Sequence, residues 1–330
     1  MRNIIVAILF FSNFVLDAQE KVNVVCSASM FADMTKNIGG EYVLVSTIVP
    51  IGGDPHIYEA TPGDAQMVKK ADLIFINGLT FEGWIEELVD NSGTKGEKYI
   101  ITKGIKPISS NDYKNSYDPH AWMNAQYGII YCKNIVDALT SFAPNHAEYF
   151  KANFDRYKKE LEETDIYIKN QIKSIPKEKR ILVTSHDAFN YYGQQYGLRL
   201  EAIQGISTDA DVRTSDISRV TNIIKETGIS SIFIESTINP KLIKQLATDN
   251  GVTIGGELFA DSLGEEDGVA GTYIKMLKSN TDVIVKALAK QEIQETKIDG
   301  DNSMSSTYLY ALLALIMAIV IAVVIKKLNK

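Results

Sequence analysis

The chain has 330 residues, of which 45% are hydrophobic and 23% charged, and its formal net charge is -7. This length suits two globular lobes rather than one core, and the composition is that of a soluble protein. The negative charge argues against a partner that is a nucleic acid or an anionic membrane surface.

Residues 1–18 have the pattern of a secretory signal peptide. Arg2 precedes an apolar run, and the small residue Ala18 stands just before polar residues. We therefore predict cleavage after Ala18 and an exported, periplasmic protein. Export permits a disulfide, but Cys26 lies in a strand-like run and Cys132 in a helix-like one, so two separately buried thiols are expected.

Residues 308–325 carry no charge and are followed by Lys326 and Lys327. A run of this length is near the lower limit for crossing a bilayer, and the lysines fit a cytoplasmic end. We expect a transmembrane anchor over residues 308–325. Residues 291–307 are polar and are expected to tether the folded part to this anchor.

Strand-like apolar runs alternate with helical patterns through the first half of the folded part. Strands are expected at residues 22–27, 42–48, 73–76 and 99–102, and helices at residues 31–38, 62–71, 81–89 and 122–139. Such alternation is typical of a parallel sheet covered by helices. We predict an N-terminal βα lobe over residues 19–145.

Residues 146–176 are predicted to form one long helix, because nearly all of this stretch lacks glycine and proline and its apolar residues recur at helical spacing. A helix of this size is about 45 Å long, which suits a strut between two lobes. A second alternating series predicts a C-terminal βα lobe over residues 177–290. Its strands are expected at residues 181–184, 198–203, 231–234 and 252–254, its helices at 189–196, 215–226, 240–250 and 269–290, and a turn at Gly255-Gly256.

One tripeptide occurs twice. Asp54-Pro55-His56 is repeated as Asp118-Pro119-His120, so two of the four histidines have the same local sequence. Proline fixes its own φ and favours an extended residue before it, so the backbone next to each histidine is conformationally restricted. A restricted backbone suits a metal ligand, because it fixes the direction of the side chain.

Four residues are candidate metal ligands because each is expected beyond the carboxyl end of a strand, where ligands of βα domains bind. They are His56, His120, His186 and Asp261. On position alone Asp261 competes with the nearby acidic residues Glu257, Glu265, Glu266 and Asp267. Three imidazoles and one carboxylate complete the shell of a four-coordinate divalent transition metal. No second feature of the sequence marks His146 as a ligand, so it is interpreted as an ordinary polar residue.

Six motifs occur together in a familiar order. They are Gly53-Asp54-Pro55-His56-Ile57-Tyr58-Glu59, Ala71-Asp72-Leu73-Ile74-Phe75, Asp118-Pro119-His120-Ala121-Trp122-Met123-Asn124, Thr184-Ser185-His186-Asp187-Ala188-Phe189, Ile234-Glu235-Ser236 and Gly255-Gly256-Glu257-Leu258-Phe259-Ala260-Asp261. Over about residues 21–290 the chain resembles the cluster A-I solute-binding proteins of ABC transporters that take up zinc, manganese or iron. The resemblance implies two lobes joined by one long helix, with the metal at their interface. It also implies His56, His120, His186 and Asp261 as ligands and an ABC permease of the cytoplasmic membrane as partner.

The resemblance leaves the metal open between Zn²⁺ and Mn²⁺. Residues 103–117 lack the histidines of many zinc-dedicated members, and His186 stands where manganese-dedicated members often have glutamate. Imidazoles favour zinc, whereas a bidentate Asp261 would suit manganese. Binding needs neutral imidazoles and should weaken below about pH 6. Glu59 and Glu235 are candidates to orient the ligands, with Asp187 and Ser185 as weaker ones.

The predicted fold is therefore α/β, with two doubly wound βα lobes joined by one long helix, a metal site at the lobe interface and a C-terminal transmembrane helix. The predicted function is capture of a divalent transition metal outside the cytoplasmic membrane and delivery to the permease. An enzyme is not expected, since four protein ligands leave no position for an activated water. Two alternatives stay open, a metallohydrolase with Glu59 or Asp187 as base and a surface adhesin.

Overall fold

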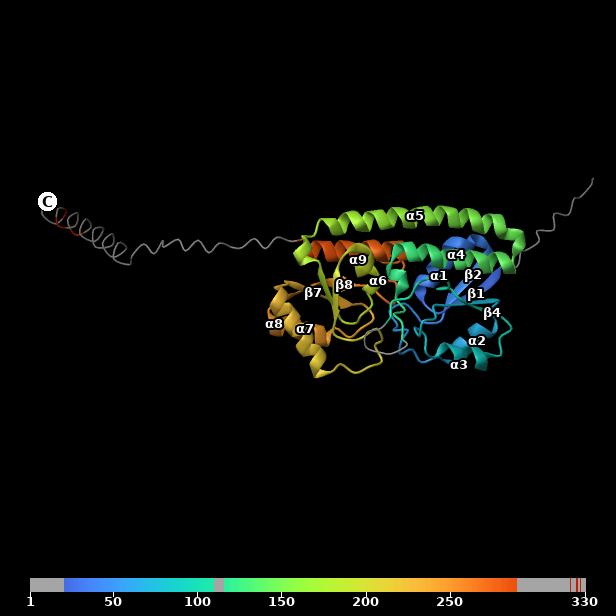
Figure 1. Cartoon of the computed structure of the whole chain (residues 1–330), viewed down its shortest axis with the longest axis horizontal. Coiled ribbons are helices and arrows are strands. Elements are labelled where there is room, and N and C mark those ends of the chain that lie inside the picture. The colour runs from blue at the N-terminus through green and yellow to red at the C-terminus, as the bar shows by residue number, and fades with distance from the viewer. Residues whose placement is uncertain (1–20, 110–115, 290–320, 322–324, 326, 328–330) are drawn as a thin grey trace, which may run out of the picture. The chain divides into compact units, whose positions relative to one another are not determined.

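The computed structural model describes residues 21–109 and 116–289, together with residues 321, 325 and 327 (Figure 1). The chain divides into two units, Met1–Ala289 and Lys290–Lys330, and the fold described below belongs to the first. The predicted signal peptide at residues 1–18 and the predicted tether at residues 291–307 lie outside the described residues.

A parallel four-stranded sheet with the order β2-β1-β3-β4 organises the N-terminal half. Its strands are β1 (Val22–Cys26), β2 (Val43–Thr47), β3 (Leu73–Ile76) and β4 (Glu97–Ile100). The two central strands are almost wholly buried, as expected for a sheet with helices on both faces. These helices are α1 (Ser29–Gly39), α2 (Pro62–Lys69), α3 (Ile85–Ser92) and α4 (Ala125–Phe142).

The C-terminal half contains two parallel strand pairs. β5 (Ile181–Thr184) pairs with β6 (Arg199–Ala202), and β7 (Ser231–Glu235) pairs with β8 (Thr253–Leu258), with β7 packed next to β5. The helices are α6 (Asn190–Tyr196), α7 (Thr214–Thr227), α8 (Lys241–Asn250) and α9 (Tyr273–Leu288). Short 3₁₀ helices in the chain are η1 (Gly40–Tyr42), η2 (Ala121–Met123), η3 (Pro144–His146) and η4 (Lys177–Lys179).

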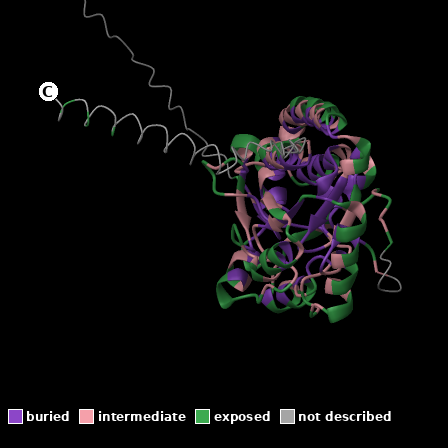
Figure 2. Ribbon diagram, turned by 90° about the vertical axis from the view of Figure 1, so that its left-hand side faces the viewer, coloured by how far each residue is buried: buried purple, intermediate pink, exposed green. Residues whose placement is uncertain are grey.

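Helix α5 (Ala147–Lys173) runs along one side of the molecule and packs on α4 and α1 of the first half and on α9 of the second (Figure 1). Its buried residues recur at helical spacing along one face and are Phe150, Tyr157, Leu161, Thr164, Asp165, Ile168 and Ile172. One hydrophobic cluster extends from Val22 to Leu288, so the two halves share a core. Figure 2 shows this buried interior, with exposed residues on the outer faces of the helices. The division into lobes at residues 19–145 and 177–290 stays a prediction.

The predicted turn at Gly255-Gly256 is wrong, because β8 continues through both glycines to Leu258. The register between β7 and β8 shifts at this point, and Gly256 has a φ of +149°. A Cβ atom on Gly255 would lie 2.7 Å from the ring of Phe233 and 2.9 Å from Cβ of Ala287. The glycines therefore allow α9 to approach the strand closely, and they do not end it.

The predicted C-terminal transmembrane helix is also wrong. Within the described parts of the chain, no helix has the length and apolar character needed to cross a membrane. Of residues 308–325, only 321 and 325 belong to those parts. The prediction depended on a short apolar run at the lower limit of what spans a hydrocarbon core.

Both cysteines are buried free thiols, as predicted. Cys26 lies in β1 and Cys132 in α4. Burial raises the pKa of the Cys26 thiol to about 12 and also raises that of Cys132, so neither forms a reactive thiolate at neutral pH.

We expect Gly255→Ala to destabilise the protein by about 1–3 kcal/mol, because the added methyl group overlaps Phe233 and Ala287. Urea denaturation of the wild type and the variant measures this difference. Gly83→Ala is the matched control, since a Cβ atom there meets nothing within 4 Å. Equal stability of the Gly255→Ala variant and the control would contradict the close packing of α9 on β8.

Candidate metal centre

His56 lies in the loop between β2 and α2, and its side chain is only 2% exposed. The carboxylate of Asp54 accepts a hydrogen bond from the backbone N–H of His56 at 2.9 Å. The indole N–H of Trp84 donates to the carbonyl of Pro55 at 2.8 Å. The ring of Phe81 packs edge-on against the imidazole, with 5.0 Å between the ring centroids. These contacts hold the loop and direct the imidazole inward.

His120 lies directly before η2, in the second copy of the tripeptide, and is fully buried. Asp118 accepts from the backbone N–H of His120 at 2.9 Å, as Asp54 does for His56. The same Oδ1 atom also lies 2.7 Å from Nδ1 of the imidazole. The other oxygen of Asp118 accepts from the amide of Asn190 at 3.0 Å. The carboxylate thus fixes both the backbone and the ring of His120.

His186 follows β5 and Asp261 follows β8, and both are fully buried. Glu235, the last residue of β7, accepts from the backbone N–H of His186 at 2.8 Å and lies 2.6 Å from its Nδ1. The indole N–H of Trp122 donates to the carbonyl of Ala260 at 2.9 Å. A residue of the first half therefore fixes the chain next to Asp261.

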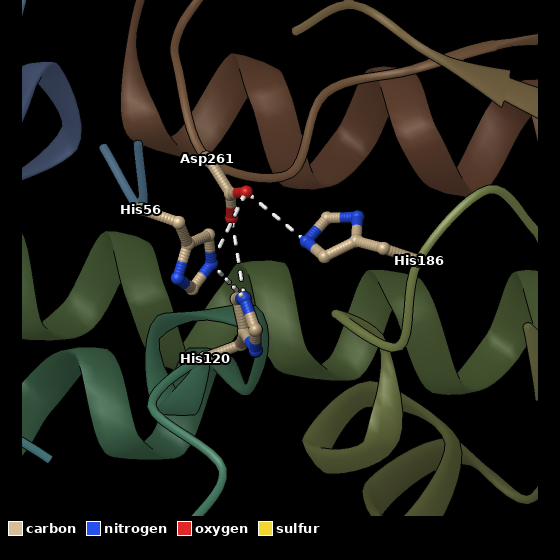
Figure 3. A group of neighbouring side chains, drawn as sticks. All are labelled: His56, His120, His186 and Asp261. Carbon is tan, nitrogen blue, oxygen red and sulfur yellow. Dashed lines mark hydrogen bonds and ion pairs between the residues drawn. The ribbon is translucent and has the colours of Figure 1, made fainter. Parts of the chain in front are cut away.

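The structure brings the four predicted ligands together from four separate loops (Figure 3). One donor atom from each of them lies within 4.8 Å of all the others. Nε2 of His56 is 3.3 Å from Nε2 of His120, and oxygens of Asp261 lie 3.7 Å from His56, 3.4 Å from His120 and 3.0 Å from His186. Tetrahedral donors with zinc bonds of about 2.0–2.1 Å stand about 3.3 Å apart. The observed spacings agree with one small cation among them.

Several donor atoms of this cluster have no hydrogen-bond partner. Among the described residues, neither oxygen of Asp261 and neither ring nitrogen of His186 makes a hydrogen bond of good geometry, although all are buried. An unsatisfied buried polar group costs about 1–3 kcal/mol, and more when it is charged. A cation at the common point would satisfy the oxygens of Asp261 and Nε2 of His186, while Nδ1 of His186 lies 2.6 Å from Glu235. The residues present therefore fit a bound metal ion.

The electrostatics of the three imidazoles differ. Burial lowers the pKa of His56 to about 3, so this ring is neutral at physiological pH. Burial also acts to lower the pKa of His120, but the carboxylates of Asp118 and Asp261 raise it to about 9. Glu235 and Asp261 likewise raise the pKa of His186 well above its usual value. In turn the imidazoles of His186 and His120 overcome burial and hold the pKa of Asp261 far below its usual range.

The residues expected to orient the ligands have different surroundings. Glu235 touches His186, whereas Glu59 is exposed. Ser185 is buried next to His186, and burial raises the pKa of the Asp187 carboxyl. Sequence analysis missed Asp118, which contacts the ring of His120. The repeat of the Asp-Pro-His tripeptide contained the signal, since the aspartate is part of both copies.

Comparison with known proteins places the chain in a family. Residues 24–287 match the family described as zinc-uptake complex component A, periplasmic. The chain belongs to this family. Its members are solute-binding components of ABC uptake systems that work with a membrane permease, and they are not enzymes. The predicted family resemblance and the predicted absence of enzymatic activity are confirmed, and the metallohydrolase alternative is excluded.

Individual relatives agree with this membership. The chain is 35% identical over 279 residues to the manganese ABC transporter substrate-binding lipoprotein PsaA of Streptococcus mitis, covering 82% of this chain and 90% of that protein. It is 33% identical to the manganese-binding lipoprotein MntA of Bacillus subtilis, covering 87% and 100%. The structure of the periplasmic zinc-binding protein TroA of Treponema pallidum superposes with a TM-score of 0.78 at 32% identity, covering 82% and 100%. This likeness supports the predicted α/β fold of two lobes.

We expect Asp118→Asn to lower the pKa of His120 from about 9 toward its usual value, because the carboxylate beside Nδ1 is one of the groups that raise it. NMR titration of the His120 ring in the metal-free protein measures the shift. Glu59→Gln is the control, since Glu59 is exposed. An unchanged His120 pKa in Asp118→Asn would contradict this account of the charge distribution.

Proposed function

We propose that the protein captures one Mn²⁺ or Zn²⁺ ion outside the cytoplasmic membrane and delivers it to an ABC permease. The observation that carries this proposal is the convergence of His56, His120, His186 and Asp261 on one buried point. The metal is the cargo of the protein. The family description, with its reference to uptake and to the periplasm, supports both the role and the location.

The donor set supports binding of both metals, with zinc bound more tightly. Three imidazoles suit zinc, and the general order of affinities puts Zn²⁺ above Mn²⁺. Asp261 directs one oxygen at His120 and the other at His56 and His186, so both oxygens face the same point. A bidentate carboxylate there raises the coordination number and suits Mn²⁺. Selection of the metal then depends on supply as well as on affinity.

The proposed ligands come from both halves of the molecule, which bears on delivery. His56 and His120 belong to loops of the N-terminal half, and His186 and Asp261 to loops of the C-terminal half. Because α5 and a shared core hold the halves together, release of the ion requires local movement of a ligand loop. Docking on the permease would supply the energy for that movement.

We expect the natively purified protein to contain about one Zn²⁺ or Mn²⁺ ion per chain by elemental analysis, and to bind zinc more tightly in a competition titration. His56→Ala and His120→Ala should each weaken binding by more than about 100-fold, since changes outside the ligand shell already cost 10–100-fold. His146→Ala is the matched control, because His146 stacks on Tyr42 with a centroid distance of 4.0 Å and is not one of the four.

Metal binding at parent strength by both ligand variants would show that the site is elsewhere. A wild-type protein that bound neither zinc nor manganese would overturn the proposed function itself. A signal for an exchangeable metal-bound water would also speak against a shell closed by four protein ligands.

We expect the apparent affinity for Zn²⁺ to rise with pH by at least about tenfold per unit between pH 6 and 9, because His120 and His186 must lose protons to bind the metal. Protons therefore compete with the metal well above pH 6, the value near which the pKa of an unperturbed histidine would end this competition. His56, with its pKa lowered to about 3, adds nothing to the slope. Competition with a chelator at several pH values measures the effect, and a flat profile above pH 7 would refute it.

A further inference from the structure

A five-residue segment touches the loops of two proposed ligands from opposite halves. This bridging segment, residues 204–208, follows β6 in the C-terminal half. Its N-terminal end makes backbone hydrogen bonds to the residues on both sides of His186. The backbone N–H of Gln204 donates to the carbonyl of Ser185 at 2.9 Å, and that of Asp187 donates to the carbonyl of Gly205 at 3.2 Å. Ile206, in the middle, is buried.

The other end of the bridging segment reaches the N-terminal half. The hydroxyl of Thr208 donates to Oδ2 of Asp54 at 2.6 Å. The second oxygen of the same carboxylate, Oδ1, accepts from the backbone N–H of His56 at 2.9 Å. One carboxylate therefore joins Thr208 to the backbone of a proposed ligand. A hydrogen bond to an ionised acceptor is stronger than one between neutral groups.

We propose that Thr208 is a positioning residue of the metal centre, whose hydroxyl holds the His56 loop to the bridging segment and thereby slows release of the bound ion. This inference rests on the proposed metal-binding function. Thr208 is not one of the four ligands, and its effect passes through Asp54 to His56. A second contact between the halves, from the N–H of Gly52 to the hydroxyl of Ser262 at 2.8 Å, lies next to Asp261 and does not involve Thr208.

The effect should appear in the rate of release. For the ion to leave, His56 must separate from the ligands held by the C-terminal half, His186 and Asp261. The bond between Thr208 and Asp54 joins the same two bodies and must break in that movement, so it adds to the barrier.

The test compares Thr208→Val with the wild-type full chain loaded with Zn²⁺, in a stopped-flow experiment in which a chelator removes the ion. Valine keeps the shape of threonine and removes the donor. We expect release about tenfold faster, as for the loss of one hydrogen bond to a charged group. Thr208→Ser keeps the hydroxyl and should release zinc within about twofold of the wild-type rate.

Thr248→Val is the matched control. Thr248 is exposed on α8, and its hydroxyl donates to the carbonyl of Lys244 of the same helix at 3.0 Å, so the same chemical change is made at a position that contacts none of the four ligands through this hydroxyl. In an Asp54→Ala background, Thr208→Val should cause no further acceleration, because the acceptor is already absent. The melting temperature of each metal-free variant separates effects on folding from effects on release. Thr208→Ala is a second variant if valine does not fold.

Wild-type release rates in both Thr208→Val and Thr208→Ala would overturn the inference while leaving the proposed function intact. Equal acceleration by serine and valine, or acceleration that persists without Asp54, would also overturn it. A wild-type protein that binds neither Zn²⁺ nor Mn²⁺ overturns the proposed function and this inference together.

Discussion

The structure depends on one buried carboxylate. Asp261 is fully buried, and among the described residues its two oxygens have no hydrogen-bond partner of good geometry. An unpaired buried charge is strongly unfavourable, so the surrounding groups must compensate it. Here the compensation comes from the imidazoles of His186 and His120, which lie 3.0 and 3.4 Å from its oxygens, while the neutral ring of His56 lies 3.7 Å away. The loops that hold the three histidines therefore have to converge on this carboxylate.

This convergence requires the two halves to be held in a fixed relation, and residues next to the ligands do so. Tyr273, at the start of α9, donates from its backbone N–H to Asp33 of α1 at 3.0 Å and from its hydroxyl to the carbonyl of Trp122. Trp122 in turn donates to the carbonyl of Ala260. This hydrogen bond joins Trp122, two residues after His120, to Ala260, the residue directly before Asp261. Helix α5 adds to this connection, because it packs on α1 and α4 of the first half and on α9 of the second.

The sequence predicted the parts of the site that local patterns encode. The repeated tripeptide marked His56 and His120, and the strand before His186 marked that residue, whereas Asp261 needed the family resemblance because other acidic residues lie nearby. The ring contact of Asp118 and the link from Thr208 to Asp54 join segments far apart in sequence or depend on side-chain direction, so no local pattern shows them. The predicted turn at Gly255-Gly256 failed because packing against α9 decided the role of both glycines.

The two copies of the tripeptide are identical in sequence, but their histidines differ in pKa. In both, the aspartate accepts from the N–H of its histidine. Asp118 also contacts the ring of His120, which raises the pKa of that ring, whereas Asp54 directs its second oxygen at Thr208 and leaves the ring of His56 neutral. An arriving cation can therefore bind His56 without displacing a proton, while binding to His120 must release one. The carboxylates that orient the rings thus also determine how strongly protons compete with the metal.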